Sequence, residues 1–248
     1  TVWLPLSLKA IEGSAFFFCT NLKTVEYAGS QDDWDQVAFD KFRNESLVNA
    51  QMHFANLLTA DKFSDVPHNW AYDGINYCYT HRLMRGIDGE RFAPKATTTR
   101  AQIVQILYNL QGEPEVSGPM PFDDVFNHWA EKPILWAYQT GVVAGTSDTT
   151  FDPDKPVTRE QIAVILMGYV DRILKLEHTW EPADLSGYPD AGSVSGWAKD
   201  ALADAVALGL ISGASNGGQT YLDPQGSATR EQVATILMEF CKNVMNKQ

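Results

Sequence analysis

The chain has 248 residues, of which 44% are hydrophobic and 11% aromatic, and this apolar content excludes wholesale disorder. Its formal net charge of −12 disfavours nucleic-acid binding and docking on anionic lipid, because both partners are polyanions. The sequence contains no run of about 18 apolar residues, so it predicts no membrane-spanning helix. Cys19, Cys78 and Cys241 are too far apart for a disulfide framework or a Cys-x-x-Cys metal site.

The N-terminal segment carries a pattern of its own between Ile11 and Tyr27. This run, IEGSAFFFCTNLKTVEY, resembles one unit of the BspA-type leucine-rich repeat. The resemblance implies that five side chains point into a solenoid, with the cysteine acting as a packed small hydrophobe: Ala15, Phe16, Cys19, Leu22 and Val25. Residues 32–54 resemble the tail that closes such solenoids, with a last short strand at 50–54. Because a solenoid needs about three units to bury its core, we expect residues 1–56 to end a longer array, and the chain to be a C-terminal piece of a longer protein.

An internal repeat fills the rest of the chain. The run from Phe63 to Ala71, FSDVPHNWA, returns as FDDVFNHWA from Phe122 and more loosely from Tyr188. Each copy continues with an aromatic residue shortly before a proline: Phe92-Ala-Pro94, Phe151-Asp-Pro153 and, with one residue more, Tyr221-Leu-Asp-Pro224. The first two copies align without a gap, and the third carries insertions around Gly217-Gly218. We place the copies at residues 61–115, 120–178 and 186–243.

Two helices are predicted in each copy. The first follows the Trp-Ala pair and stops at Gly141 in the second copy and Gly209 in the third, where a left-handed glycine is the usual helix end. The first copy has Arg82 at that place, so we expect its helix to end differently. The second helix starts at a capping box and continues with an apolar residue at positions i, i+3, i+4 and i+7. The capping boxes are Thr99…Gln102, Thr158…Gln161 and Thr229…Gln232.

The apolar stripes of these second helices are equivalent in the three copies. Their members are Ile103, Ile106, Leu107 and Leu110, then Ile162, Ile165, Leu166 and Tyr169, then Val233, Ile236, Leu237 and Phe240. Three equivalent stripes in a short chain most simply pack against one another. The sequence therefore predicts a mainly α fold, a pseudo-threefold helical bundle with three loop-rich prongs, plus short strands in the N-terminal segment.

An arginine follows each capping threonine: Arg100, Arg159 and Arg230. The first turn of a helix favours acidic residues, because its unpaired amides and the helix dipole are positive. A cation there makes sense if an anion also binds, since amides and a guanidinium together suit a carboxylate or phosphate. The alternative is that each arginine pairs with a repeated aspartate, Asp65, Asp124 or Asp190, and both can hold.

The repeated tryptophans, Trp70, Trp129 and Trp197, also allow two interpretations. A tryptophan at a helix start is more often a core anchor, but an exposed one stacks on the C–H face of a sugar. His68 and His128 precede their tryptophans by different distances, so we interpret them as loop residues and predict no metal site.

Taken together, Phe-x-Asp-Val…Trp-Ala, Gly-x-x-x-Gly, Phe-x-Pro and Thr-Arg-Glu-Gln resemble the S-layer homology domain in three tandem copies over about residues 61–243. The resemblance implies a three-pronged spindle on the bacterial cell surface. It implies that grooves of this spindle bind a secondary cell-wall polysaccharide, often pyruvylated and thus anionic. The implied ligand-binding residues are Arg100, Arg159, Arg230, Trp70, Trp129, Trp197, Asp65, Asp124, Asp190, Gly86, Gly145 and Gly213. The second copy matches the pattern best, so it is our first candidate for a working groove.

Two other classes of function remain as alternatives. A wall-directed glycosidase needs two carboxylates with separated pKa values in one cleft, but the repeat supplies one aspartate per copy. Gly-x-Ser-x-Gly, His-Glu-x-x-His and phosphate-loop motifs do not occur in the sequence, so we predict neither an enzyme nor a cofactor. Adhesion to a protein partner through the leucine-rich segment is the other alternative.

Overall fold

The computed structural model describes residues 1–5, 8–27, 29, 31–54 and 59–245. It divides into two compact units. One comprises Thr1–Val66 with Asn76–Phe92, and the other comprises Pro67–Ile75 with Ala93–Gln248.

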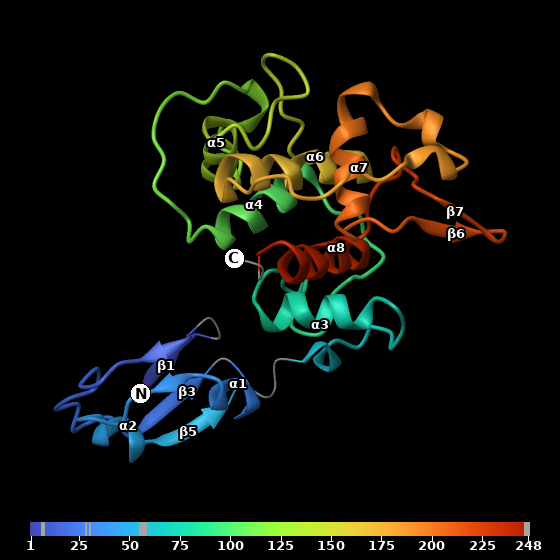
Figure 1. Cartoon of the computed structure of the whole chain (residues 1–248). Coiled ribbons are helices and arrows are strands. Elements are labelled where there is room, and N and C mark those ends of the chain that lie inside the picture. The colour runs from blue at the N-terminus through green and yellow to red at the C-terminus, as the bar shows by residue number, and fades with distance from the viewer. Residues whose placement is uncertain (6–7, 28, 30, 55–58, 246–248) are drawn as a thin grey trace. The chain divides into compact units, whose positions relative to one another are not determined.

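The N-terminal strands form a parallel sheet of three members in the order β1 (Val2–Leu4), β3 (Thr24–Tyr27) and β5 (Gln51–Phe54) (Figure 1). A second parallel pair joins β2 (Ala10–Ile11) to β4 (Ala38–Phe39), and two short helices, α1 (Gln31–Asp35) and α2 (Glu45–Val48), complete the segment. The main sheet is in register, with Val2 opposite Val25 and Val25 opposite Met52. Strand β5 confirms the strand predicted at 50–54.

The packing of this segment corrects part of the prediction for its side chains. Val25 is fully buried, and Phe16 and Leu22 are half-buried against the same core. Cys19 and Ala15 are not buried in that core, and Cys19 is exposed. The prediction of Cys19 as a packed small hydrophobe was therefore wrong, although backbone hydrogen bonds join Phe16, Cys19 and Leu22 in successive turns.

The remaining elements are mainly helical, as predicted. The helices are α3 (Tyr72–Thr80), α4 (Arg100–Leu110), α5 (Glu131–Gln139), α6 (Arg159–Tyr169), α7 (Lys199–Ala207) and α8 (Arg230–Asn243). All three capping boxes are confirmed, with both reciprocal hydrogen bonds present at the starts of α4, α6 and α8. The predicted apolar stripes are buried except for Leu110, which is half-buried. Helix α4 packs against α5, and α6 packs against α7.

The first helix of each copy ends in the same way, which corrects the expectation for Arg82. Gly141 and Gly209 have φ of 76° and 71°, and Arg82 takes the same left-handed conformation at 59°. In each copy the next two amides return to one carbonyl, that of Cys78, Ala137 or Ala205. The hydrogen bonds at this helix end therefore hold Arg82 in a left-handed conformation that glycine adopts without strain.

The loop before the proline is also the same in the three copies. The residue that precedes the proline is left-handed each time, with φ of 59° at Ala93, 59° at Asp152 and 50° at Asp223. The buried residue before it is Phe92, Phe151 or Leu222. Leu222 thus takes the place that we assigned to Tyr221, and the third copy has no extra residue there. The expectation of an aromatic residue was wrong, because the buried residue at this position of the third copy is aliphatic.

A ring of three backbone hydrogen bonds connects the copies just before their capping threonines. The amide of Thr98 donates to the carbonyl of Ala228 at 2.9 Å, Ala228 to Val157 at 3.0 Å, and Val157 to Thr98 at 2.9 Å. All three residues are fully buried. Each copy therefore gives one bond and accepts one.

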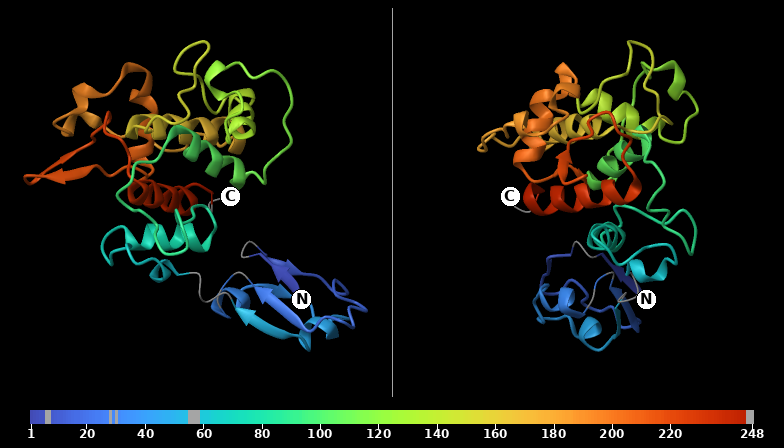
Figure 2. Two further views of the ribbon diagram at one scale, coloured as in Figure 1. Left: turned by 180° about the vertical axis from the view of Figure 1, so that it is seen from behind. Right: turned by 90° about the vertical axis from the view of Figure 1, so that its right-hand side faces the viewer.

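The insertion in the third copy forms a hairpin. Strands β6 (Ala214–Asn216) and β7 (Gln219–Tyr221) pair antiparallel and project beside α7 and α8 (Figure 2). The two residues between them, Gly217 and Gly218, both have positive φ, as a tight hairpin turn requires.

Candidate functional site

The first turns of α4, α6 and α8, which carry the arginines, have no unpaired amides. The expectation that unpaired amides at these helix starts help to bind an anion was therefore wrong. At α4, Thr99 donates to the Gln102 side chain, Arg100 to the Lys155 carbonyl at 3.0 Å and Ala101 to the Pro153 carbonyl at 2.9 Å. Gln102 donates to the Thr99 hydroxyl at 3.3 Å. The starts of α6 and α8 follow the same scheme. An anion at these positions therefore has only the guanidinium to bind.

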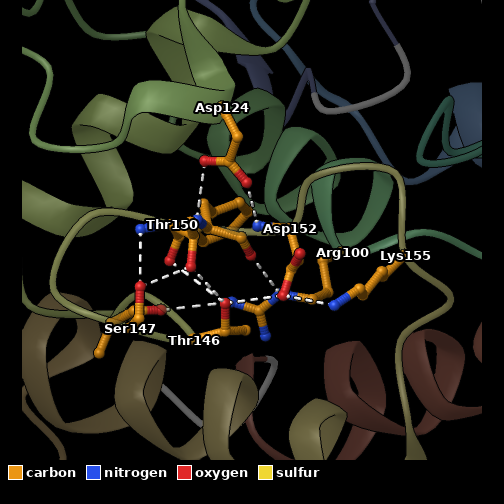
Figure 3. A network of polar contacts seen from close by, with 9 residues as sticks. Arg100, Asp124, Thr146, Ser147, Thr150, Asp152 and Lys155 are labelled. Atoms are coloured by element: carbon orange, nitrogen blue, oxygen red, sulfur yellow. Dashed lines mark hydrogen bonds and ion pairs between the residues drawn. The ribbon is translucent and has the colours of Figure 1, made fainter.

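The Arg100 guanidinium is held by the loop of the second copy (Figure 3). Nε donates to the Phe151 carbonyl at 2.9 Å, Nη2 donates to the Ala144 carbonyl at 3.2 Å, and the group lies 4.4 Å from the centre of the Phe151 ring. The residue is 6% exposed. Burial lowers the pKa of Arg100, and the charges of Asp152 and Asp124 oppose this shift. It remains a cation, because the unshifted pKa of arginine lies far above neutrality.

The other two arginines are placed in the same way where the structure describes them. Arg159 is 5% exposed and donates through Nε to the Leu222 carbonyl at 2.7 Å, in the loop of the third copy. Burial lowers its pKa as well, opposed by Asp223 and Asp190. Arg230 is half-buried, and its amide donates to the carbonyl of Ala96 at 2.8 Å. Each helix start thus contacts the loop of another copy.

The repeated aspartates hold backbone amides. Asp124 accepts from the amides of Phe151 at 2.9 Å and Asp152 at 2.7 Å (Figure 3). Asp190 makes the same two bonds to the third-copy loop, and Asp65 accepts from the Phe92 amide at 2.8 Å. Among the residues that the structure describes, no carboxylate lies within ion-pair distance of Arg100. The aspartates therefore fix the loops whose carbonyls receive the arginines.

The repeated glycines Gly86, Gly145 and Gly213 lie at tight turns beneath the first aromatic residue of each copy. A Cβ on Gly145 would collide with the Ser147 and Thr150 carbonyls, and one on Gly86 would collide with Phe63 and Arg91. Gly213 also has a φ of 81°. These positions need glycine for packing alone, whatever else they contact.

The three tryptophans are exposed, at 60% for Trp70, 59% for Trp129 and 61% for Trp197. This excludes the core-anchor interpretation and leaves their ring faces open to a ligand. Glu160, a buried carboxylate, accepts from the Ser195 amide at 3.0 Å and hydroxyl at 2.8 Å, and so holds the chain two residues before Trp197.

One large cleft brings together residues of all three copies. It has a volume of about 1360 Å³ and is lined by Arg100 from the first copy, the 141–146 loop and α6 from the second, and Trp197 and α7 from the third. Of the predicted site residues, Arg100, Gly145 and Trp197 therefore meet here. Arg159 and Trp129 do not line this cleft, so the groove of the second copy is built around an arginine that belongs to the first.

The sequence analysis did not identify a group of polar residues that also lines the cleft. His178 lies 2.7 Å from Asp171 and stacks on Trp180 at 4.5 Å, and the Trp180 indole donates to Asp204 at 2.9 Å. His178, Asp171 and Asp204 line the cleft. His178 is the last residue of the second copy and Trp180 lies in the linker that follows, outside the repeated motifs, so comparison of the repeats gives no signal for them.

Two kinds of feature are absent from the described residues. They contain no group of three or more His, Cys, Asp and Glu side chains arranged to hold a metal ion. Within the same residues, none of the helices has the length and apolar character that crossing a membrane requires.

Comparison with known proteins agrees with the repeat structure. The family model of the S-layer homology domain matches residues 62–104, 121–163 and 187–234. An endoglucanase of Bacillus sp. (strain KSM-635) is 34% identical over 71% of this chain, and a surface-layer 125 kDa protein of Lysinibacillus sphaericus is 34% identical over 71%. A cellulosome-anchoring protein of Acetivibrio thermocellus is 29% identical over 66%.

These relatives are much longer than the chain, which spans 18%, 14% and 36% of their respective lengths. The match to the endoglucanase therefore carries nothing about catalysis. The family match and the surface-layer relative point to the cell surface and cell wall as the location.

Proposed function

We propose, because the chain belongs to the S-layer homology domain family, that it anchors a bacterial surface protein to the cell wall without a covalent bond. Its ligand is an acidic wall polysaccharide, bound in the cleft that Arg100 and Trp197 line. The observation that supports this proposal is the presence of a buried guanidinium and an exposed indole face in one open cleft. A carboxylate suits the first and a sugar ring the second.

The charge of the ligand follows from the state of Arg100. Two of its donors are engaged by backbone carbonyls, and the guanidinium is screened from water. One singly charged group, such as the carboxylate of a pyruvate ketal, matches one partly engaged guanidinium. The overall acidity of the chain does not oppose such binding, because surface charges farther away than about 8 Å are screened at physiological ionic strength.

A pseudo-threefold arrangement of the three copies forms part of this proposal. The ring of hydrogen bonds through Thr98, Val157 and Ala228 and the shared scheme of the helix starts support it. Such an arrangement would present equivalent grooves to one polymer, so that weak sites gain by avidity. The copies then lie at residues 61–115, 120–178 and 186–243.

The test is co-sedimentation with purified cell walls that carry the polysaccharide and with the same walls after its chemical removal. We expect binding to the first and not to the second, and competition by a methyl glycoside of pyruvylated N-acetylmannosamine. Equal binding to both walls would refute the polysaccharide as ligand. Failure of the pyruvylated sugar to compete would refute the proposed acidic group.

A matched pair of variants locates the site. Trp197→Ala and Trp129→Ala remove indoles of equal exposure, but only Trp197 lines the cleft. Loss of one stacking face should weaken wall binding about fivefold or more for Trp197→Ala. Trp129→Ala should weaken wall binding less than Trp197→Ala does, because it leaves the Arg100 cleft intact. The opposite ranking would move the site to another groove.

The N-terminal segment supports a second proposal, that residues 1–56 end a leucine-rich-repeat region that contacts a protein. The supporting observations are the in-register parallel strands and an exposed cluster in which the Arg43 guanidinium lies 5.1 Å from the Phe17 ring and 5.2 Å from the Phe42 ring. Removal of residues 1–56 should leave wall binding unchanged. A loss of wall binding would assign the segment to the anchoring function instead.

A further inference from the structure

Three exposed phenylalanines gather beside Arg43 in the N-terminal unit. Phe17, Phe18 and Phe42 are 42%, 78% and 64% exposed. The centres of the Phe17 and Phe18 rings are 4.1 Å apart, and the Arg43 guanidinium lies over the rings of Phe17 and Phe42. We call these four residues the Arg43 patch. It lies outside the three copies of the repeat, so it is not part of a groove between them.

Two bulky members of the patch have a strained backbone. Phe18 and Arg43 are left-handed, with φ of 58° and 54°. Glycine would make the same turns without strain, and asparagine with less. Both side chains are exposed, so neither adds to the core in return. Strained residues whose side chains do not support the fold point to a role outside folding.

Hydrogen bonds hold the two loops that carry the patch. Asn44 is fully buried, and its side chain donates to the carbonyl of Glu12 and accepts from the amide of Phe16, each at 2.8 Å. The amide of Ser14 donates to the carbonyl of Phe42 at 2.7 Å, which joins one loop to the other. The patch is therefore formed in advance, and a partner does not have to order these loops on binding.

The charge of Arg43 is not matched within its own unit. Among the described residues, no carboxylate lies within ion-pair distance of this guanidinium. Contact with the rings uses the flat faces of the guanidinium and leaves the N–H groups at its edge, which can donate two parallel hydrogen bonds to one carboxylate. Lys41 is a second exposed cation, next to Phe42 in the sequence. The patch is thus complementary to a negative charge.

We propose that the Arg43 patch is the docking surface for an acidic, apolar segment of a protein partner. A carboxylate of this segment pairs with Arg43, and an apolar side chain beside it packs on Phe18 and Phe42. Aromatic and arginine side chains are the types most enriched where proteins bind one another. The proposal rests on the protein contact proposed above for residues 1–56, and it assigns that contact a surface and a partner chemistry.

The test measures binding of a fluorescein-labelled peptide of three Glu-Leu repeats to the full chain by fluorescence anisotropy. Arg43→Gln should weaken binding about fivefold or more, because the carboxylates lose their charged partner. Phe18→Gly should weaken binding by about the same factor without lowering the midpoint of thermal unfolding, because glycine is unstrained there. A folding defect cannot then explain the loss. Unchanged binding in both variants would overturn the proposal.

Two matched variants of the other unit serve as controls. Lys132→Gln removes an exposed cation, and Phe126→Ala removes a ring that is 73% exposed. Both should bind the peptide as the parent does. A loss in Lys132→Gln equal to that in Arg43→Gln would show attraction by net charge alone. A loss in Phe126→Ala equal to that in Phe18→Gly would show a non-specific apolar contact, and either result overturns the proposal.

Three further probes test the chemistry of the partner. A peptide of three Lys-Leu repeats should bind more weakly, and equal binding would overturn the assignment to an acidic segment. A peptide of three Glu-Ser repeats should also bind more weakly, and equal binding would overturn the apolar contact. Phosphatidylglycerol vesicles at the same concentration of negative charge should bind more weakly too, and equal binding would assign the patch to a lipid surface instead.

Trp3→Ala separates this proposal from the one on which it rests. Trp3 is an exposed aromatic residue on β1, outside the patch. We expect it to leave peptide binding unchanged. If Trp3→Ala weakens binding and Arg43→Gln does not, the protein contact through residues 1–56 stands and the Arg43 patch is overturned. If neither these two variants nor Phe18→Gly alters binding, both proposals fall.

Discussion

Replacement of Asp124 by alanine tests whether the repeated aspartates are parts of the scaffold. The Asp124 carboxylate accepts two amides, those of Phe151 at 2.9 Å and Asp152 at 2.7 Å, and so holds a left-handed residue in place. Because Asp124 is exposed, each bond contributes only about 0.5–1.5 kcal/mol to the free energy of unfolding. Loss of both should cost about 2 kcal/mol, and lower the unfolding midpoint by about 4–8 °C for a chain of this size.

The assay is urea unfolding followed by circular dichroism, with thermal unfolding as a second measure. Asp124→Asn keeps one acceptor oxygen and should lose about half as much free energy. Asp190→Ala breaks the equivalent pair of bonds and should match Asp124→Ala. Asp123→Ala, which removes the neighbouring exposed carboxylate, is the control and should change little. If Asp124→Ala is no less stable than Asp123→Ala, the scaffold role is wrong.

Three shorter predictions concern the same elements. Thr158→Ala removes an N-cap and should cost about 1 kcal/mol in urea unfolding, and no loss would contradict the capping box. Gly145→Ala should destabilise the chain because its Cβ meets backbone carbonyls, whereas Gly192→Ala, with open space around it, should not; equal midpoints would count against the tight turn. Hydrogen bonds from Lys155 and Thr146 lower the pKa of Asp152, so its stabilisation is present above the unfolded pKa and is lost as pH falls through the folded pKa. Asp152→Asn should therefore lose less stability between neutral and acid pH than the parent, and parallel midpoint-versus-pH curves would contradict this.

Local signals made most of the helical framework predictable. A capping box and an apolar stripe are written within about 12 residues, so Thr99, Thr158 and Thr229 could be assigned as helix caps from the residue pattern alone. The same applies to the helix ends at Gly141 and Gly209. Arg82 shows the limit of local signals, because the tertiary hydrogen bonds of the ending overrode the preference of the side chain.

The residues that surround the arginines could not be predicted from one copy of the repeat alone. The acceptors for Arg100 are Phe151 and Ala144, in the next copy along the chain, and those for its amide and its neighbour's are Lys155 and Pro153. An aligned repeat shows which residues recur but not which copy they face. For this reason the sequence pattern identified the arginine, but it did not show that carbonyls of another copy accept the hydrogen bonds of the amides at the helix start.

The hydrogen-bond ring through Thr98, Val157 and Ala228 has a consequence for how such chains can grow or shrink. A closed circuit of this kind has no spare donor and no spare acceptor. Removal of any one copy would leave one amide and one carbonyl without hydrogen-bond partners in the buried interior. A fourth copy would find no free amide and carbonyl in the ring to pair with. We therefore expect gene duplication or loss to preserve the set of three copies. Backbone hydrogen bonding, rather than the strength of attachment, then determines the number of copies.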